Sequence, residues 1–187
     1  MASSDSAARQ GDPLVRRVDL PEGGLQRLAA RFQEGLRVRV PDGISVADFL
    51  VERLGVDPGY VKQRISTVFL DASVVDDVEA AHLHQGSCLA LSAAMPGLVG
   101  ATLRKGGYYA AMRAAITLAE APGSDAAGGR PVEVTVKLFN LLIEELGPAL
   151  LAHGFALAPV EAQALLGAPL AGLPADAPEV WLRVAAR

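Results

Sequence analysis

Two stretches of the chain alternate between apolar and polar residues. In residues 36–40 two arginines separate the apolar positions, and in residues 132–138 a glutamate, a threonine and a lysine do so. A period of two residues is typical of a strand with one buried and one solvent-facing side, so both stretches are predicted to be strands. Shorter apolar runs predict further strands at 14–20, 66–71, 74–75, 89–92 and 180–184.

One helix is especially well signalled, over residues 46–54. Ser45 precedes it and Asp48 follows three residues later, a variant of the capping box that satisfies the free N–H groups of the first turn. Apolar residues then recur along one face, and Gly55 stands where a left-handed C-terminal cap belongs. Other helices are expected near 25–32, at 108–121, after Asn140 as a capping residue, and after Pro159.

The order of these elements predicts an α+β protein, with short strands in one mixed sheet and a central amphipathic helix on one face. A polar leader is expected at 1–12, a first domain at 13–100, a Gly-rich loop and helix at 101–121, and a linker at 122–130. Residues 131–187 are expected to form an extension packed on the first domain. Its strand at 132–138 should extend the sheet or cover its open edge.

Composition excludes several classes of protein. Apolar residues make up 51% and charged residues 20% of the chain, so it should fold, and a net charge of -4 makes nucleic acid a poor partner. Gly and Pro interrupt the longest uncharged runs, so no membrane-spanning helix is expected. The polar N-terminus and the single cysteine, Cys88, favour a cytoplasmic protein without disulfides.

Three segments, LRVRVPDGISVADFLVERLG, VFLDASVVDD and LHQGSCLALSAAMPG, occur in that order between Leu36 and Gly100. This region resembles the β-grasp sulfur carriers, namely the small subunit of molybdopterin synthase and the thiamine-pathway carrier. The resemblance implies a β-grasp (ubiquitin-like) mixed sheet with one central helix, here followed by a C-terminal strand and helix extension. A shared fold does not by itself imply a shared activity.

The chemistry of that family requires a free C-terminal Gly-Gly, and here the chain departs from the pattern. The tail position holds the segment Pro96 to Gly100, a Gly-Gly pair follows only at Gly106 and Gly107, and the chain continues to Arg187. The intact chain is therefore not expected to carry sulfur. A precursor of a sulfur carrier or ubiquitin-like modifier, cut after Gly100 or Gly107, is an alternative.

The loop from Met95 to Arg113 is the main candidate binding site. Two basic residues precede a Gly-Gly pair and a predicted helix start, so backbone N–H groups and positive charge converge on a place suited to an anion. The alternative is a connecting loop, in which glycines only supply turn conformations. The candidate residues are Arg104, Lys105, Gly106, Gly107, Tyr108, Tyr109 and Arg113.

A second candidate is a metal site at His82, His84 and Cys88, because two imidazoles and a thiolate are zinc and copper ligands. No fourth ligand lies nearby, and a cysteine that leads into an apolar strand commonly behaves as a small buried apolar residue. No nucleophile motif, Walker loop or dinucleotide fingerprint occurs. The sequence therefore favours a binding or accessory module with no cofactor, whose partner is a protein or a small anionic ligand, over an enzyme.

Overall fold

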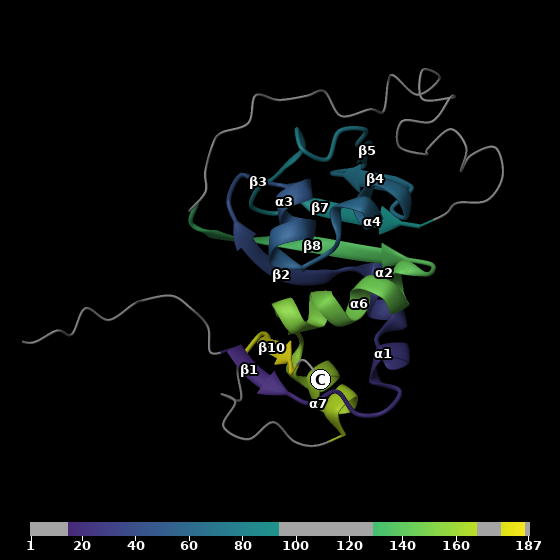
Figure 1. Ribbon diagram of the computed structural model, residues 1–187. Coiled ribbons are helices and arrows are strands. Elements are labelled where there is room, and N and C mark those ends of the chain that lie inside the picture. Colours follow the sequence, from purple (N-terminus) through teal and green to yellow (C-terminus); the bar gives the residue numbers. More distant parts are fainter. Residues whose placement is uncertain (1–14, 94–128, 168–176, 186–187) are drawn as a thin grey trace, which may run out of the picture.

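The computed structural model describes residues 15–93, 129–167 and 177–185. It is an α+β structure with one large mixed sheet (Figure 1). The strands are β1 Val15–Val18, β2 Leu36–Pro41, β3 Ile44–Ser45, β4 Thr67–Leu70, β5 Ser73–Val74, β6 His82–Leu83, β7 Cys88–Ser92, β8 Pro131–Phe139, β9 Phe155–Leu157 and β10 Val180–Val184. The helices are α1 Gly24–Arg27, α2 Ala29–Glu34, α3 Val46–Asp48, the π-helical turn η1 Phe49–Arg53, α4 Pro58–Gln63, α6 Leu142–His153 and α7 Pro159–Leu166.

The large sheet has the strand order β1-β10-β9-β2-β8-β7-β4-β5, and β3 and β6 form a separate pair. Strand β8 lies in its interior, antiparallel to β2 and parallel to β7. The strand joins the sheet, as expected, but it lies between β2 and β7 rather than at an edge. The alternating pattern had correctly predicted its one-sided burial, but alternation reports which face is buried and carries no signal about lateral neighbours.

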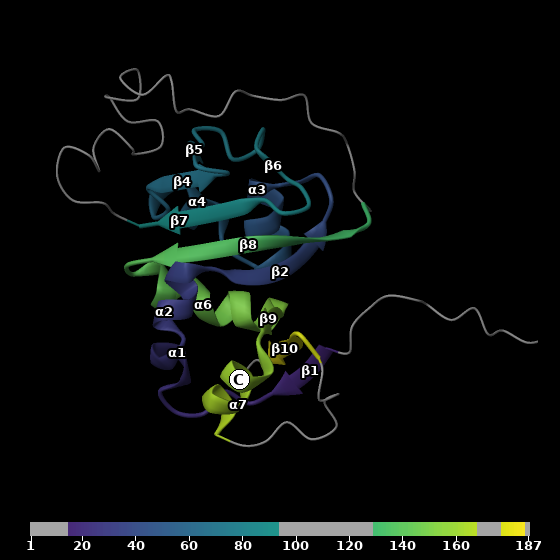
Figure 2. The ribbon, with the colours of Figure 1, turned by 180° about the vertical axis from the view of Figure 1, so that it is seen from behind.

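The apolar positions of β2, β7 and β8 face the same layer of helices. In Figure 1 α3 lies in front of the sheet, and in Figure 2, the view from behind, β2, β7 and β8 lie in front of it. Phe49 and Leu50 are both 0% exposed, as the apolar stripe of residues 46–54 predicts. The central part of the sheet is therefore packed on one face by this helical segment.

The start of the helical segment is built as its sequence predicts. Ser45 Oγ accepts a hydrogen bond from the Asp48 N–H at 3.0 Å and donates one to the Asp48 carboxylate at 2.8 Å. Gly55 has a φ of +69°, the left-handed conformation that glycine adopts without strain. Helix α4 is not among the helices that the sequence analysis predicts. Asp57 caps it by accepting from the Tyr60 N–H, with Pro58 in its first turn.

The C-terminal residues form a second packed unit that continues the same sheet. Strand β10 pairs antiparallel to β9 and parallel to β1, and β9 joins β2 through Arg37 and Ala156. Helix α6 begins at Leu142 and its N-cap residue, Leu141, offers no side-chain cap. The prediction that Asn140 caps this helix was wrong, because the N-cap position falls one residue later; Asn140 has a φ of +56°, and its side-chain amide donates to Ser92 Oγ.

Candidate functional site

The main predicted site, Met95 to Arg113, lies outside the described residues, and so do all of its candidate binding residues. These are Arg104, Lys105, Gly106, Gly107, Tyr108, Tyr109 and Arg113. The site therefore stays a prediction. What the structure describes is the pair of strands to which this part of the chain is joined, β7 before it and β8 after it.

Both attachment points are well anchored. On the β7 side, Ser66 Oγ donates to the carbonyl of Ala93, and the Ser66 N–H donates to the carbonyl of Ser92. On the β8 side, the Asp42 N–H donates to the carbonyl of Arg130 at 2.9 Å. A Cβ placed on Gly129 would lie 2.4 Å from the carbonyl oxygen of Asp42, so only glycine fits this approach without a shift.

The predicted metal ligands do not gather at one point. His82 lies on β6, and its Nδ1 is 2.8 Å from the carbonyl of Ala80. His84 Nδ1 lies 2.9 Å from the carboxylate of Asp42, and the Cys88 N–H donates to the carboxylate of Asp71 at 2.7 Å. Within the described ranges no three His, Cys, Asp or Glu side chains form a group able to hold a metal ion.

The His84–Asp42 pair is a feature that sequence reasoning missed. The two residues are 42 positions apart and meet because β3 pairs with β6, which places the turn after β2 beside the turn before β7. Arg130 Nε lies 3.9 Å from the same Asp42 carboxylate. The His84 side chain is 60% exposed, so solvent reaches it. No signal in the sequence indicates this pairing.

The sheet face away from α3 carries a charged network centred on β2. Arg39 lies over the ring of Trp181 at 4.3 Å and pairs with Glu133 at 3.0 Å. Arg37 pairs with Glu133 and with Glu179. Because the guanidinium groups are paired with carboxylates of the same chain, the network holds β10 and β8 to β2 and presents no isolated basic group.

A second polar cluster joins α4 to α6. The Arg64 guanidinium donates to the Glu145 carboxylate, with Nε 3.0 Å from one oxygen, and the Tyr60 hydroxyl donates to the same carboxylate. The hydrogen bond from Arg64, aided by that from Tyr60, lowers the pKa of Glu145 to about 2. Burial, together with the hydrogen bond to Glu145, raises the pKa of Tyr60 to about 12. Both groups therefore keep fixed protonation states near neutral pH, which suits a structural link better than proton transfer.

No helix in the described ranges is long and apolar enough to cross a membrane. The chain matches no protein-family model, and no curated protein and no solved structure matched it.

Proposed function

We propose that this chain is a non-enzymatic binding or accessory protein. It is built on a β-grasp domain and presents the loop from Met95 to Arg113 to a protein partner or a small anionic ligand. The observation that supports this most is the parallel pairing of β7 with β8. A β-grasp sheet has two parallel strands side by side at its centre, with a helix packed across them.

The strand order β2-β8-β7-β4-β5 fits that description, with β7 and β8 as the parallel pair. In the sulfur carriers the first and last strands of the domain form this pair. Here β8 follows β7 in the chain, so a later segment supplies the strand that comes first in those proteins. We infer a β-grasp core with a permuted chain order, in which the strand that comes first in the carriers follows the strand that comes last.

The permuted order also supports the placement of the binding loop. Strands β7 and β8 are parallel, and the last residue of β7, Ser92, is opposite the last residue of β8, Phe139. The first residue of β8, Pro131, therefore lies at the other end of the pair. Residues 93–130 therefore join opposite ends of two neighbouring central strands. Arg104 and Lys105 belong to this connection between the two central strands.

The test is a double variant, Arg104→Ala with Lys105→Ala, compared by titration with pyrophosphate and with a glutamate-rich peptide. Removing these two positive charges should weaken binding about five-fold and leave the melting temperature nearly unchanged. The control is Arg53→Ala with Lys62→Ala, which removes the same charge from two exposed positions outside the loop. Equal affinities in the three proteins would refute the proposal.

A processed precursor of a carrier or modifier is the second candidate, favoured by the position of β7 directly before the segment that contains Gly100 and Gly107. Cleavage after Gly107 would leave β8 on the other fragment, held by pairing with β2 and β7. The measurement is the intact mass of the protein from its native cells. A fragment ending at Gly100 or Gly107 supports processing, and full-length protein alone contradicts it.

A further inference from the structure

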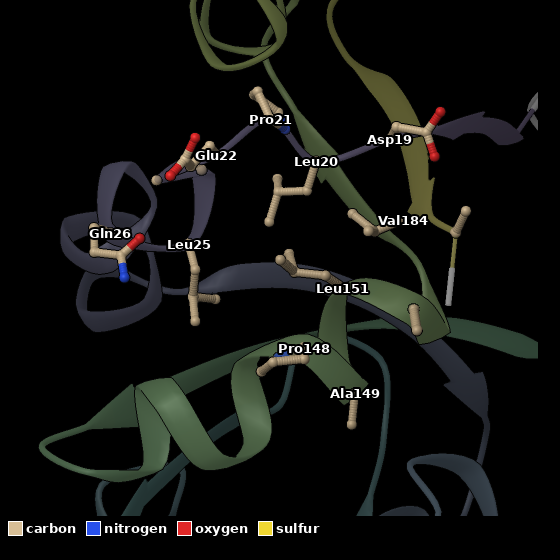
Figure 3. A pocket seen from close by; sticks show the side chains of 14 residues that line it. Asp19, Leu20, Pro21, Glu22, Leu25, Gln26, Pro148, Ala149, Leu151 and Val184 are labelled. Atoms are coloured by element: carbon tan, nitrogen blue, oxygen red, sulfur yellow. The ribbon is translucent and has the colours of Figure 1, made fainter. Parts of the chain in front are cut away.

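A cavity of about 820 Å³ opens between α1, α6 and the end of β10, far along the chain from the proposed binding loop. Its walls come from residues 19–26, from the outer side of α6 and from Val184 and Ala185. The volume lies in the range that holds small organic ligands. Figure 3 shows Leu20, Leu25 and Leu151 pointing toward one another, with Asp19 and Glu22 on opposite sides of them.

The wall formed by the α1 segment is closely fitted. A Cβ on Gly24 would lie 2.6 Å from Cγ of Leu20, so the helix start and this leucine approach as closely as glycine permits. The Gly24 N–H donates to the carbonyl of Pro21 at 2.9 Å and closes the turn before the helix. The turn therefore places the Leu20 and Leu25 side chains in the wall of the cavity. The carboxylates of Asp19 and Glu22 lie at the margin of the cavity.

Among the described residues, the cavity has a mainly apolar lining and charge of one sign only. The described side chains that line it include Asp19 and Glu22 and no lysine, arginine or histidine. The nearby Arg27 guanidinium donates to the backbone carbonyl of Glu22 at 3.1 Å rather than to either carboxylate. Within the described part of the chain neither carboxylate forms an ion pair, so both negative charges stay uncompensated beside an apolar surface.

We propose that this cavity binds a small organic cation with an aliphatic body, of the class of primary alkylamines. The aliphatic part would lie against Leu20, Leu25 and Leu151, where its burial removes apolar surface from water. The ammonium group would remain at the margin, beside the carboxylate of either Asp19 or Glu22, where a negative charge attracts a cation and repels an anion. This site is independent of the anion-binding loop and takes ligands of the opposite charge.

The experiment titrates the full chain with hexylammonium, hexanol and heptanoate and follows the backbone amide signals of Gly23, Gly24 and Ala149 by NMR. Hexylammonium should shift these signals and bind about five-fold more tightly than heptanoate, because the three probes share a hexyl chain and differ in charge. Signals that do not move, or equal affinity for the cation and the anion, would overturn the proposal.

Two variants test the two halves of the site. Asp19→Asn with Glu22→Gln should weaken hexylammonium about five-fold and leave hexanol unchanged, while Glu144→Gln, an exposed acidic position of α6 outside the cavity, should change neither. Ala149→Leu fills part of the cavity and should weaken both hexylammonium and hexanol. Unaltered hexylammonium binding in either cavity variant would contradict the proposed site.

Discussion

At the residue scale, His153 shows how packing sets the chemistry of a side chain that has no signal in the sequence. Its Nε2 lies 2.8 Å from the carbonyl of Arg39, so this nitrogen carries the proton and donates, and its ring meets Phe49 edge-on with centroids 5.8 Å apart. Burial lowers the pKa of His153, and the positive charges of Arg183 and Arg53 lower it further. The folded protein therefore holds this imidazole neutral.

The lowered pKa predicts a loss of stability in mild acid. In the unfolded chain a histidine takes up a proton at about pH 6.5, whereas His153 in the fold resists it, so the free energy of unfolding should fall as the pH drops below that value. The slope due to this group is at most about 1.4 kcal/mol per pH unit. Urea unfolding between pH 7.5 and 5 measures it.

His153→Gln is the matched variant for this prediction, because glutamine keeps a donor for the Arg39 carbonyl and does not titrate. His82 and His84 are present in both proteins, so the difference between the two pH profiles isolates His153. Parallel profiles would show that His153 does not contribute to the acid sensitivity.

At the scale of elements, the described helices begin in different ways, and a local cap alone did not decide which of them the sequence predicts: α3 was predicted from its cap, whereas α4 was missed although it has one. Ser45 and Asp57 cap α3 and α4 through side-chain oxygens, and both signals are local. Helix α6 has no side-chain cap and relies on burial of residues such as Leu146 and Leu150 against the rest of the core. Its start was therefore placed wrongly, at a capping Asn140, although the helix itself was predicted.

The Ser45 cap gives a prediction for this scale. Ser45→Ala removes the acceptor for the Asp48 N–H, and the loss should lower the free energy of unfolding by about 1 kcal/mol, within a range of about 0.5–2 kcal/mol. Chemical denaturation measures this difference. Ser73→Ala, a half-buried serine in β5 away from any helix start, is the control and should change stability by less than about 0.5 kcal/mol. Equal effects of the two substitutions would show that the cap contributes nothing specific.

At the scale of the whole molecule, β8 ties the two ends of the chain together. It exchanges backbone hydrogen bonds with β2 over residues 36–41 and with β7 over residues 88–92, and it leads directly into α6 and the C-terminal strands. The N-terminal strand β1 in turn pairs with β10 near the C-terminus. Both halves of the sequence therefore contribute to one sheet and one core.

This arrangement predicts that cleavage within residues 122–129 will not separate the protein into two free parts. A single cut leaves β8 between β2 and β7, with its apolar face in the core, so the fragments should elute together from a sizing column without denaturant. Denaturant should then release them as two species. Fragments that separate in native buffer would show that the pairing of β8 is too weak to hold the two parts.

The sequence by itself determined the local structure of this protein. The alternation in residues 36–40 and 132–138, the Ser45 cap and the apolar stripe ending at Gly55 each depend on residues close together in the chain. The structure confirms all of them. The α+β class follows from the order of such elements and is confirmed at that level. The binding loop at 95–113 stays a prediction.

Only the tertiary structure decided which strands are neighbours and which side chains meet. Strands pair through backbone N–H and carbonyl groups, which nearly every residue carries, so a side-chain pattern cannot show that β8 lies between β2 and β7. The same holds for the His84–Asp42 contact and for the cavity beside Leu20 and Leu151, whose residues come from distant segments. These features form only when the strands assemble into the sheet. The local pattern of side chains does not show which distant residues then come into contact.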